Sequence, residues 1–431
     1  MLAPLGGLPR PFGKQDMTMQ IPDDLPPDIA EAYRAAAEKN VLAALNPKVF
    51  FGYFSVCADG RGHGGNTTFP GLDWGQSAEA LLWLGRSAEV LASWEYVKGF
   101  QREDGLVPFA ILPGSAGQTM GGKYPLTVAR NGAVFEHWVP GNPLRTLANV
   151  TTILLMERIY SLVNDFCPLP DKRQKSFTSR VGGTEWLAQQ AEMLHRSTTW
   201  LIGQVSANGM VSGGGFYVER PTRPEYDGVN QCYTAHALQI AAGLLCDLGD
   251  AELSEQCGAV AQRIIACFRE QFWAGDHCVE YIHPERGAIH CHGLTDVDWA
   301  AIATAVASEE QVAILWPQLR DHPGFLYSGM PTGIATQPET YEDWEMQGID
   351  RHDLAAMGRV WYLESWARAR MGDRQGILRA MRRVISCGQN NNWHWRERYY
   401  SQRTGDLGRP MDTYCEYPAN LIRIVHRFLS V

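Results

Sequence analysis

The chain has 431 residues, of which 45% are hydrophobic and 20% charged, and its 38 basic and 47 acidic residues give a formal net charge of -9. This composition is typical of a soluble globular protein. The acidity is mild and there is neither a run of like charges nor a basic stripe, which argues against binding to nucleic acid or to an anionic membrane. No stretch has the roughly 18 uninterrupted apolar residues of a membrane helix, and the first residues lack a secretory signal pattern. We therefore expect a soluble, cytoplasmic protein.

Apolar periodicity and capping residues predict twelve helices along the chain. In chain order they cover residues 28–45, 75–85, 87–101, 145–163, 181–204, 228–247, 251–272, 297–306, 308–319, 350–371, 373–387 and 413–429. Strand signals are few and short. The pattern predicts an all-α protein.

The connections between these helices alternate in length. The junctions near residues 86, 249, 307 and 372 are only a few residues long, which predicts antiparallel hairpins, and the junction at 164–180 is a longer exception. Six other junctions each run to about 20 residues or more. They cover residues 46–74, 102–144, 205–227, 273–296, 320–349 and 388–412. Loops of this length inside a compact domain are usually functional.

Helices that follow a long loop differ in character from their hairpin partners. The segment 228–247 is apolar on nearly every side, as a buried helix is, whereas its partner 251–272 has a polar face. Six buried helices alternating with six amphipathic ones predict an inner and an outer ring, an (α/α)6 toroid with all six long loops on one face. We expect one such domain over residues 1–431, with 1–27 as an irregular N-terminal arm. The alternative is two stacked helical-repeat domains, although the chain has no exact repeat.

Three short motifs accompany the alternating pattern: Leu72-Asp73-Trp74-Gly75, Glu103-Asp104-Gly105-Leu106-Val107-Pro108 and Glu416-Tyr417-Pro418-Ala419-Asn420-Leu421. With these motifs the chain resembles the six-hairpin glycosidase superfamily, which includes glucoamylase-like, trehalase-like and bacterial α-L-rhamnosidase-like enzymes. We expect it to lack the accessory β-domains that are usual in rhamnosidase-like members. The resemblance implies a glycoside hydrolase. In glucoamylase-like members the catalytic acid lies in the loop before the sixth helix and the base in the loop before the twelfth.

Glycoside hydrolysis needs one carboxylic acid that protonates the leaving oxygen and one carboxylate on the other side of the bond. Acidic residues in the long loops gather at five places. These are Asp73; Glu225 with Asp227; Asp296 with Asp298; Glu342, Asp343 and Glu345 with Asp350; and Glu397 with Glu416. Any of Asp227, Asp296, Asp298 and Asp350 is equally explained as a helix N-cap.

Glu397 is the best single candidate for a catalytic carboxylate. It lies in the loop before the last helix, where the resemblance places the base, and two tryptophans, a histidine and two arginines surround it. The arginines would lower its pKa and favour the role of base. The alternative is an Arg-Glu-Arg ion-pair strip on the surface. For the acid, the loop before the sixth helix offers Glu219, Glu225 and Asp227, and the choice among Asp227, Asp298 and Glu345 stays open.

Aromatic and polar residues of the long loops are candidates for binding the sugar. Tryptophans offer flat apolar faces to sugar rings, or alternatively seal a large helical core. The candidate platforms are Trp74, Trp138, Trp299, Trp344, Trp393 and Trp395. The candidate hydroxyl ligands are Asp104, His137, Asp296, Arg396 and Tyr417.

The segment 276–292 carries histidines and cysteines on both sides of Pro284-Glu285-Arg286-Gly287, a pattern that predicts a hairpin. Zinc is conceivable from the ligand types, but the spacing fits no standard motif. We expect a polar loop under the cavity rim, with no metal and no cofactor.

We therefore expect a glycoside hydrolase that removes a terminal sugar with inversion and acts on a carbohydrate substrate, without nucleic-acid or membrane partners. The alternatives are a polysaccharide lyase with Tyr399, His137 or His394 as base, a sugar epimerase on the same toroid, or a non-catalytic carbohydrate-binding protein. The long second and fifth loops either cap the pocket or form a homodimer contact.

Overall fold

The computed structural model describes residues 21–22, 24–60, 69–108, 110–113, 127–129, 132–135, 146–165, 181–213, 223, 225–345, 354–401 and 412–430. This part of the chain contains the twelve α-helices that the sequence predicts. They are α1 (Pro27–Ala36), α2 (Gly71–Trp83), α3 (Ser87–Lys98), α4 (Leu147–Asp165), α5 (Val181–Ile202), α6 (Gly228–Asp247), α7 (Ala251–Gln271), α8 (Asp296–Ala303), α9 (Glu309–Leu319), α10 (Gly358–Arg370), α11 (Arg374–Asn390) and α12 (Glu416–Ile424).

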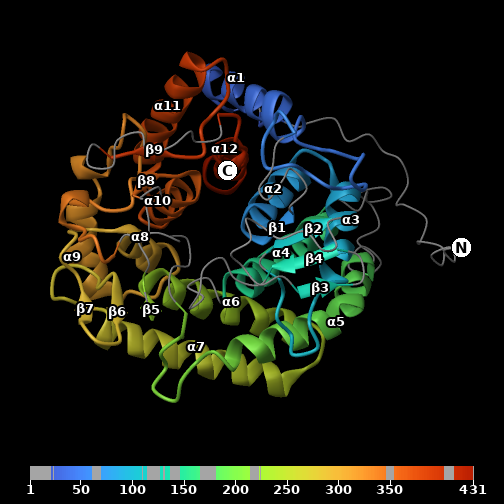
Figure 1. The fold of residues 1–431 in the computed structure, drawn as a ribbon, viewed down its shortest axis with the longest axis horizontal. Helices are drawn as coiled ribbons and strands as arrows, with labels where there is room; N and C mark the ends of the chain where they lie inside the picture. The colour runs from blue at the N-terminus through green and yellow to red at the C-terminus, as the bar shows by residue number, and fades with distance from the viewer. Residues whose placement is uncertain are drawn as a thin grey trace, which may run out of the picture.

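Six of these helices form a closed inner ring. Going round the ring, α2, α4, α6, α8, α10 and α12 each contact the next, and α12 contacts α2 again. The other six lie outside them, with α3 against α2, α5 against α4, α7 against α6, α9 against α8, α11 against α10, and α1 against α12. Figure 1 shows the two rings around a common centre. The (α/α)6 toroid is confirmed, and with it the prediction that helices following a long loop are the inner ones.

The burial of two neighbouring helices shows why the sequence sorts them this way. In α6 the buried positions run almost without interruption from Gly228 to Ala241, so the helix is covered on nearly every side. In α7 the residues Glu252 and Glu255 are exposed, while Leu253 and Cys257 face the core. A helix with one polar face is stable only where that face meets water, which places α7 outside α6.

Short strands join the loops above the ring. One sheet has the order β1-β2-β4-β3, formed by Phe69–Pro70, Ala110–Pro113, Gly132–Phe135 and Thr127–Ala129. A second sheet has the order β5-β6-β7, formed by Tyr226–Asp227, Tyr281–His283 and Gly287–Ile289. A third pairs β8 (Ala355–Ala356) with β9 (Tyr399–Tyr400). The hairpin predicted around residues 284–287 is confirmed as the antiparallel β6–β7 pair.

Two predicted helix boundaries are corrected. The helix predicted over 350–371 begins only at Gly358, because residues 355–356 form the strand β8, which is paired with β9. Asp350, a candidate N-cap, lies outside the described residues. The helix predicted over 28–45 ends as an α-helix at Ala36 and continues as a π-helical segment, Ala37–Val41. None of the helices among the described residues has the length and apolarity to cross a membrane.

Candidate functional site

A buried arginine holds three carboxylates at the N-terminal ends of α6 and α8. Arg223 and the side chains of Asp227, Glu280 and Asp296 are all 0% exposed. The arginine Nη2 lies 2.5 Å from Glu280 Oε1 and 2.9 Å from Asp296 Oδ1, and its Nη1 lies 3.5 Å from Asp227 Oδ2. One guanidinium thus faces three acidic groups, an arrangement in which not all three carboxylates can be ionised cheaply.

Backbone pairing explains how residues so far apart in the chain reach one place. Asp227 in β5 is paired with Tyr281 in β6, and the amide of Gly228 donates to the Glu280 carbonyl at 2.9 Å. A Cβ at position 228 would come within 2.5 Å of a methyl carbon of Val297, so glycine is required where β6 and α8 approach the start of α6. Glu280, the residue directly before β6, is therefore held against the two helix ends.

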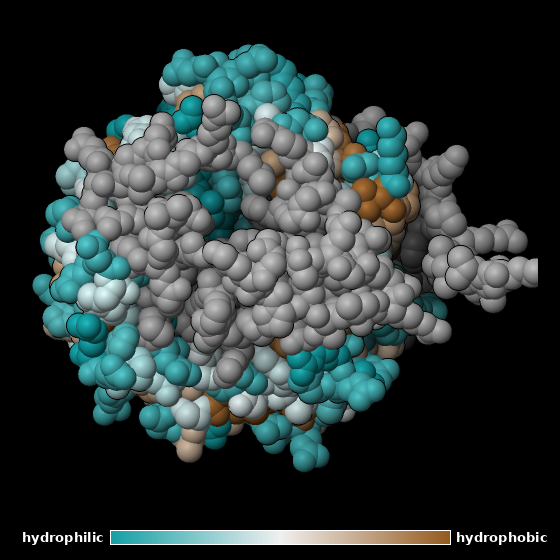
Figure 2. Space-filling view, in the orientation of Figure 1, coloured by the Kyte–Doolittle hydropathy of each residue, from teal (hydrophilic) through white to brown (hydrophobic). Residues whose placement is uncertain are grey.

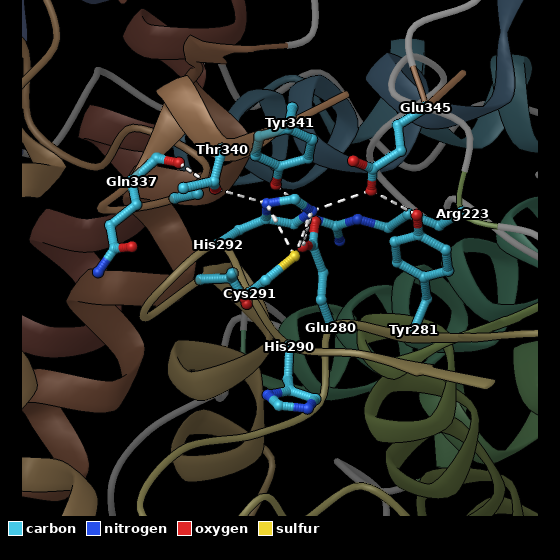
Figure 3. A network of polar contacts seen from close by, with 12 residues as sticks. Arg223, Glu280, Tyr281, His290, Cys291, His292, Gln337, Thr340, Tyr341 and Glu345 are labelled. Carbon is cyan, nitrogen blue, oxygen red and sulfur yellow. Dashed lines mark hydrogen bonds and ion pairs between the residues drawn. The ribbon is translucent and has the colours of Figure 1, made fainter. Parts of the chain in front are cut away.

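Further polar side chains are linked to Glu280 by hydrogen bonds and ring stacking (Figure 3). Tyr341 donates its hydroxyl to Glu280 Oε1 at 2.6 Å, and its ring stacks on His292 with centroids 3.6 Å apart. His292 Nε2 lies 2.9 Å from Glu345 Oε1, and the same oxygen accepts from the Tyr281 hydroxyl at 2.6 Å. We call Arg223, Asp227, Glu280, Tyr281, His292, Asp296, Tyr341 and Glu345 together the Arg223 cluster.

The carboxyl groups of this cluster have contrasting pKa values. Burial raises the pKa of Asp296 to about 7 and also raises that of Asp227, while Arg223 opposes both shifts. For Glu345 burial acts in the same direction, but hydrogen bonds from His292 and Tyr281 outweigh it and lower the pKa. The cluster therefore contains two carboxyl groups whose pKa values are raised beside one whose pKa is lowered, and contrasting pKa values of this kind are used in acid–base catalysis.

Asp298 has a different environment from its neighbour Asp296. Its Oδ1 accepts the Cys278 amide at 2.7 Å, and its Oδ2 accepts the Thr295 amide at 2.7 Å within the capping box of α8. Burial raises its pKa to about 6. Thr295 is therefore the N-cap of α8, and Asp298, expected as a possible N-cap, is instead the third helical residue of the capping box, with both oxygens bound to backbone amides. Asp227 is the N-cap of α6, as the alternative interpretation has it: its Oδ1 accepts the Asn230 amide at 3.0 Å, while its Oδ2 faces Arg223 Nη1.

Glu397 lies on the other side of the ring, in the loop before α12. It is 5% exposed, and its Oε1 is 3.1 Å from Arg398 Nη1. Arg396 is exposed and pairs with Asp412 at 3.3 Å, so the two arginines that flank Glu397 point to different partners. The Arg-Glu-Arg surface strip is thus not formed, because the glutamate is buried.

Three of the candidate sugar platforms are packed in the interior. Trp74, Trp299 and Trp395 are 1%, 1% and 0% exposed. Trp74 donates Nε1–H to Ser93 and stacks on Trp94 between α2 and α3. All three rings belong to the hydrophobic core, which is the alternative role that the sequence allows them.

The remaining candidates have different environments. Trp344 and Trp393 are half-buried, and Trp344 carries the Arg286 guanidinium 4.0 Å from its ring centroid. Asp104 is exposed and closes a local turn by accepting the Leu106 amide. Tyr417 is fully buried in α12. His137, Trp138 and Glu219 lie outside the described residues.

Five members of the Arg223 cluster were not anticipated from the sequence: Arg223, Glu280, Tyr281, His292 and Tyr341. The one local signal is Glu280, an acid set in the apolar run Cys278-Val279-Glu280-Tyr281-Ile282. A charged residue in a buried strand needs a buried partner.

The histidines and cysteines of 276–292 do not converge on one point. His277 binds Asp276 and the His290 carbonyl, whereas His292 belongs to the Arg223 cluster. Within the described residues no three His, Cys, Asp or Glu side chains are placed to hold a metal ion.

The same architecture occurs in solved structures of glycosidases. The GH78 family rhamnosidase of a Bacillus species matches with a TM-score of 0.60 and 11% identity over 92% of this chain and 35% of its own. The rhamnosidase from Klebsiella oxytoca matches with a TM-score of 0.59 and 12% identity over 95% of this chain and 65% of its own. The GH63 mannosylglycerate hydrolase from Thermus thermophilus matches with a TM-score of 0.61 and 11% identity over 93% of this chain and 100% of its own. The fold is that of the six-hairpin glycosidases.

This chain thus spans about a third of the length of the first rhamnosidase and the whole length of the mannosylglycerate hydrolase. No protein-family model matches the sequence, and no curated protein matches it either. The six-hairpin likeness is one of architecture.

Proposed function

We propose that the protein is a glycoside hydrolase that removes a terminal sugar from an oligosaccharide or glycoside with inversion, using Asp227 as the acid and Glu397 as the base. The proposal is supported by the named activities of the similar structures, which are a rhamnosidase, a mannosylglycerate hydrolase and a glucoamylase. The observation that carries it is the order of the inner ring.

In the ring α2-α4-α6-α8-α10-α12, α6 and α12 are three places apart and so lie opposite each other. Asp227 ends the loop before α6, and Glu397 lies in the loop before α12. A sugar bound over the centre of the ring would have one carboxyl group on each side. Inverting hydrolysis needs this arrangement, because water attacks the face opposite the leaving group.

The environments of the two groups match the roles we assign. Burial raises the pKa of Asp227, which favours the protonated form that an acid needs. Arg398 Nη1 lies 3.1 Å from Glu397 Oε1 and places a positive charge beside the group that we assign as the base. Asp296, with a pKa of about 7, is the next candidate for the acid, and Tyr281 and His292 hold Glu345 ionised.

The test is hydrolysis of an aryl-glycoside panel that covers α-L-rhamnoside, α- and β-glucosides, glucuronides and arabinosides. We expect the wild type to release the aryl alcohol from one sugar class, and Glu397→Gln to lower kcat by about 10²-fold or more. Asp227→Asn should lose activity on a poor leaving group and retain it on a highly acidic phenol, because a good leaving group needs no proton. Glu255→Gln, a change at an exposed position on α7, is the matched control and should be unaffected.

The stereochemistry is followed by NMR of the released sugar. A first product with retained anomeric configuration would contradict inversion, and release of internal fragments from an oligosaccharide would contradict terminal cleavage. An ultraviolet-absorbing product from a uronic polymer would show that the reaction is β-elimination and not hydrolysis. Wild-type kinetics in both carboxyl variants would remove these residues from the reaction.

A further inference from the structure

A second polar site lies deeper inside the inner ring. A cavity of about 60 Å³ is lined by residues of α2, α4, α6, α10, α12 and the π-helical segment Val425–Leu429. Glu79 and Arg158 are eight and eleven residues beyond the first residues of α2 and α4, which at 1.5 Å per residue is about 12 and 17 Å along the axes. The carboxyl groups of the Arg223 cluster, in contrast, lie at or before helix N-termini. Figure 2 shows a hollow at the centre of the ring with hydrophilic residues on its visible wall.

The charges that line this cavity do not balance. Arg423 Nε and Arg427 Nε lie 2.7 and 2.5 Å from the two oxygens of Glu79, and Arg158 Nε lies 3.8 Å from Oε1 of Glu79 and 3.1 Å from Glu157. Burial raises the pKa of Glu79, but the arginines outweigh it and lower the pKa to about 2, so this carboxylate is ionised. Among the described residues that line the cavity, three guanidinium groups thus face two carboxylates, which leaves an excess of one positive charge.

The unsatisfied groups of the cavity wall are hydrogen-bond donors. Gln76 Nε2 and the Tyr362 hydroxyl are buried and make no hydrogen bond within the described residues. Gln76 and Tyr362 are 6% and 3% exposed, and the amide oxygen of Gln76 is already used by Asn420. Leaving a buried donor unpaired is costly, so a cavity with this wall is complementary to a ligand that supplies acceptors.

The cavity is large enough for a small anion, and the histidine in its wall is neutral. His236 also lines the cavity, and burial with the nearby arginines lowers its pKa to about 4, so it is neutral at pH 7. A volume of 60 Å³ accommodates roughly four to six water-sized groups. A carboxylate on a short chain or a tetrahedral oxyanion has this size.

We propose that this cavity, the arginine cavity, binds a small oxyanion, with Arg158, Arg427, Gln76 and Tyr362 as its donors. The site is distinct from the carboxyl groups proposed for hydrolysis, and the oxyanion would supply acceptor oxygens to the donors of Gln76 and Tyr362. Charge-assisted hydrogen bonds from guanidinium groups are among the strongest in proteins, and Arg427 keeps its Nη groups for a ligand because Glu79 is held through Nε.

The experiment is calorimetric titration of the whole chain with inorganic phosphate, with acetate and with chloride, at constant ionic strength and pH 7. We expect one site that takes phosphate or acetate and not chloride. The phosphate and acetate arms distinguish a tetrahedral oxyanion from a carboxylate. Arg158→Gln should weaken binding about tenfold or more, because it removes a charged donor.

Two further variants keep the test decisive. Tyr362→Phe removes a hydroxyl that has no partner in the described part of the chain, so it should fold normally and bind the anion several-fold more weakly. Arg382→Gln changes an exposed arginine on α11 that pairs with Asp28, and its affinity should equal that of the wild type.

A parallel thermal melt should show stabilisation by the same anion in the wild type and less in Arg158→Gln, since a ligand of the folded state raises the melting temperature. Saturation by none of the three anions would overturn the proposal. So would unchanged affinity in both cavity variants, or equal weakening in Arg382→Gln. No sugar is present in these measurements, so their outcome is independent of glycosidase activity.

Discussion

Replacing Asp296 by asparagine should change how the stability of the protein depends on pH. Asp296 is fully buried beside Arg223, and burial raises its pKa from 3.8 to about 7. The asparagine has nearly the same shape and still offers one acceptor oxygen to the guanidinium, but it cannot ionise. The variant therefore removes one proton-binding group and little else.

The sign follows from the direction of the shift. Below pH 3.8 the group is protonated in both the folded and the unfolded state. Between pH 3.8 and about 7 the unfolded state has lost the proton that the folded state keeps, so the free energy of unfolding of the wild type falls as the pH rises. Above about pH 7 the loss is complete. The shift from 3.8 to about 7 corresponds to about 4 kcal/mol in total.

The assay is urea unfolding of the wild type and Asp296→Asn at several pH values from about 4 to 8. Whatever the constant cost of the substitution, the difference in unfolding free energy should move in favour of the variant by up to about 4 kcal/mol as the pH rises. Asp321→Asn is the control, because Asp321 is exposed and its pKa is lowered by Arg320, so its difference should be flat over this range. A flat difference for Asp296→Asn, or one that moves against the variant, would refute the argument that Asp296 is a proton-holding group.

Two further pairs of substitutions test the packing. Gly105→Ala should destabilise the protein by about 1 kcal/mol or more, because φ is +96° and the new Cβ would collide with the Arg196 carbonyl oxygen. Gly249→Ala, at φ +82° in open space, should cost less stability. The urea midpoints of the two variants compare these losses directly. Trp395→Ala should lower the unfolding free energy by about 3–5 kcal/mol because the ring is fully buried. Trp344→Ala, at a half-buried position, should cost far less stability and instead raise KM for the sugar. Equal losses of stability in both variants would contradict the assignment of Trp395 to the core and Trp344 to sugar binding.

The ring could be predicted from the sequence because it depends on local features, namely the hydrophobic pattern of each helix and the length of each junction. The covered helix α6 and the half-polar helix α7 differ in pattern, and the junction at Gly249 is too short for anything but a hairpin. The error at α10 has the opposite cause. Residues 354–357 carry an apolar pattern that suits a helix, and only pairing of Ala355–Ala356 with Tyr399–Tyr400, far along the chain, makes them extended.

The candidate site was only partly predictable. Asp227, Asp296 and Glu345 could be singled out because acids in long loops are conspicuous, and Asp298 with them, although its two backbone hydrogen bonds now explain it as part of a capping box. Nothing in the local pattern indicated that Arg223 would reach Asp296, 73 residues away.

The sequence by itself determined which helices are buried, where the hairpins turn and which loops are long, because hydrophobic periodicity and junction length act over a few residues. The tertiary structure alone decided which charges meet. Burial raises the pKa of Asp296, whereas hydrogen bonds from His292 and Tyr281 lower that of Glu345. Closure of the ring brings Arg158, Arg423 and Arg427 around Glu79. Electrostatic energies depend on the distance between charges in space and on their removal from water, and neither quantity can be read from the amino-acid sequence.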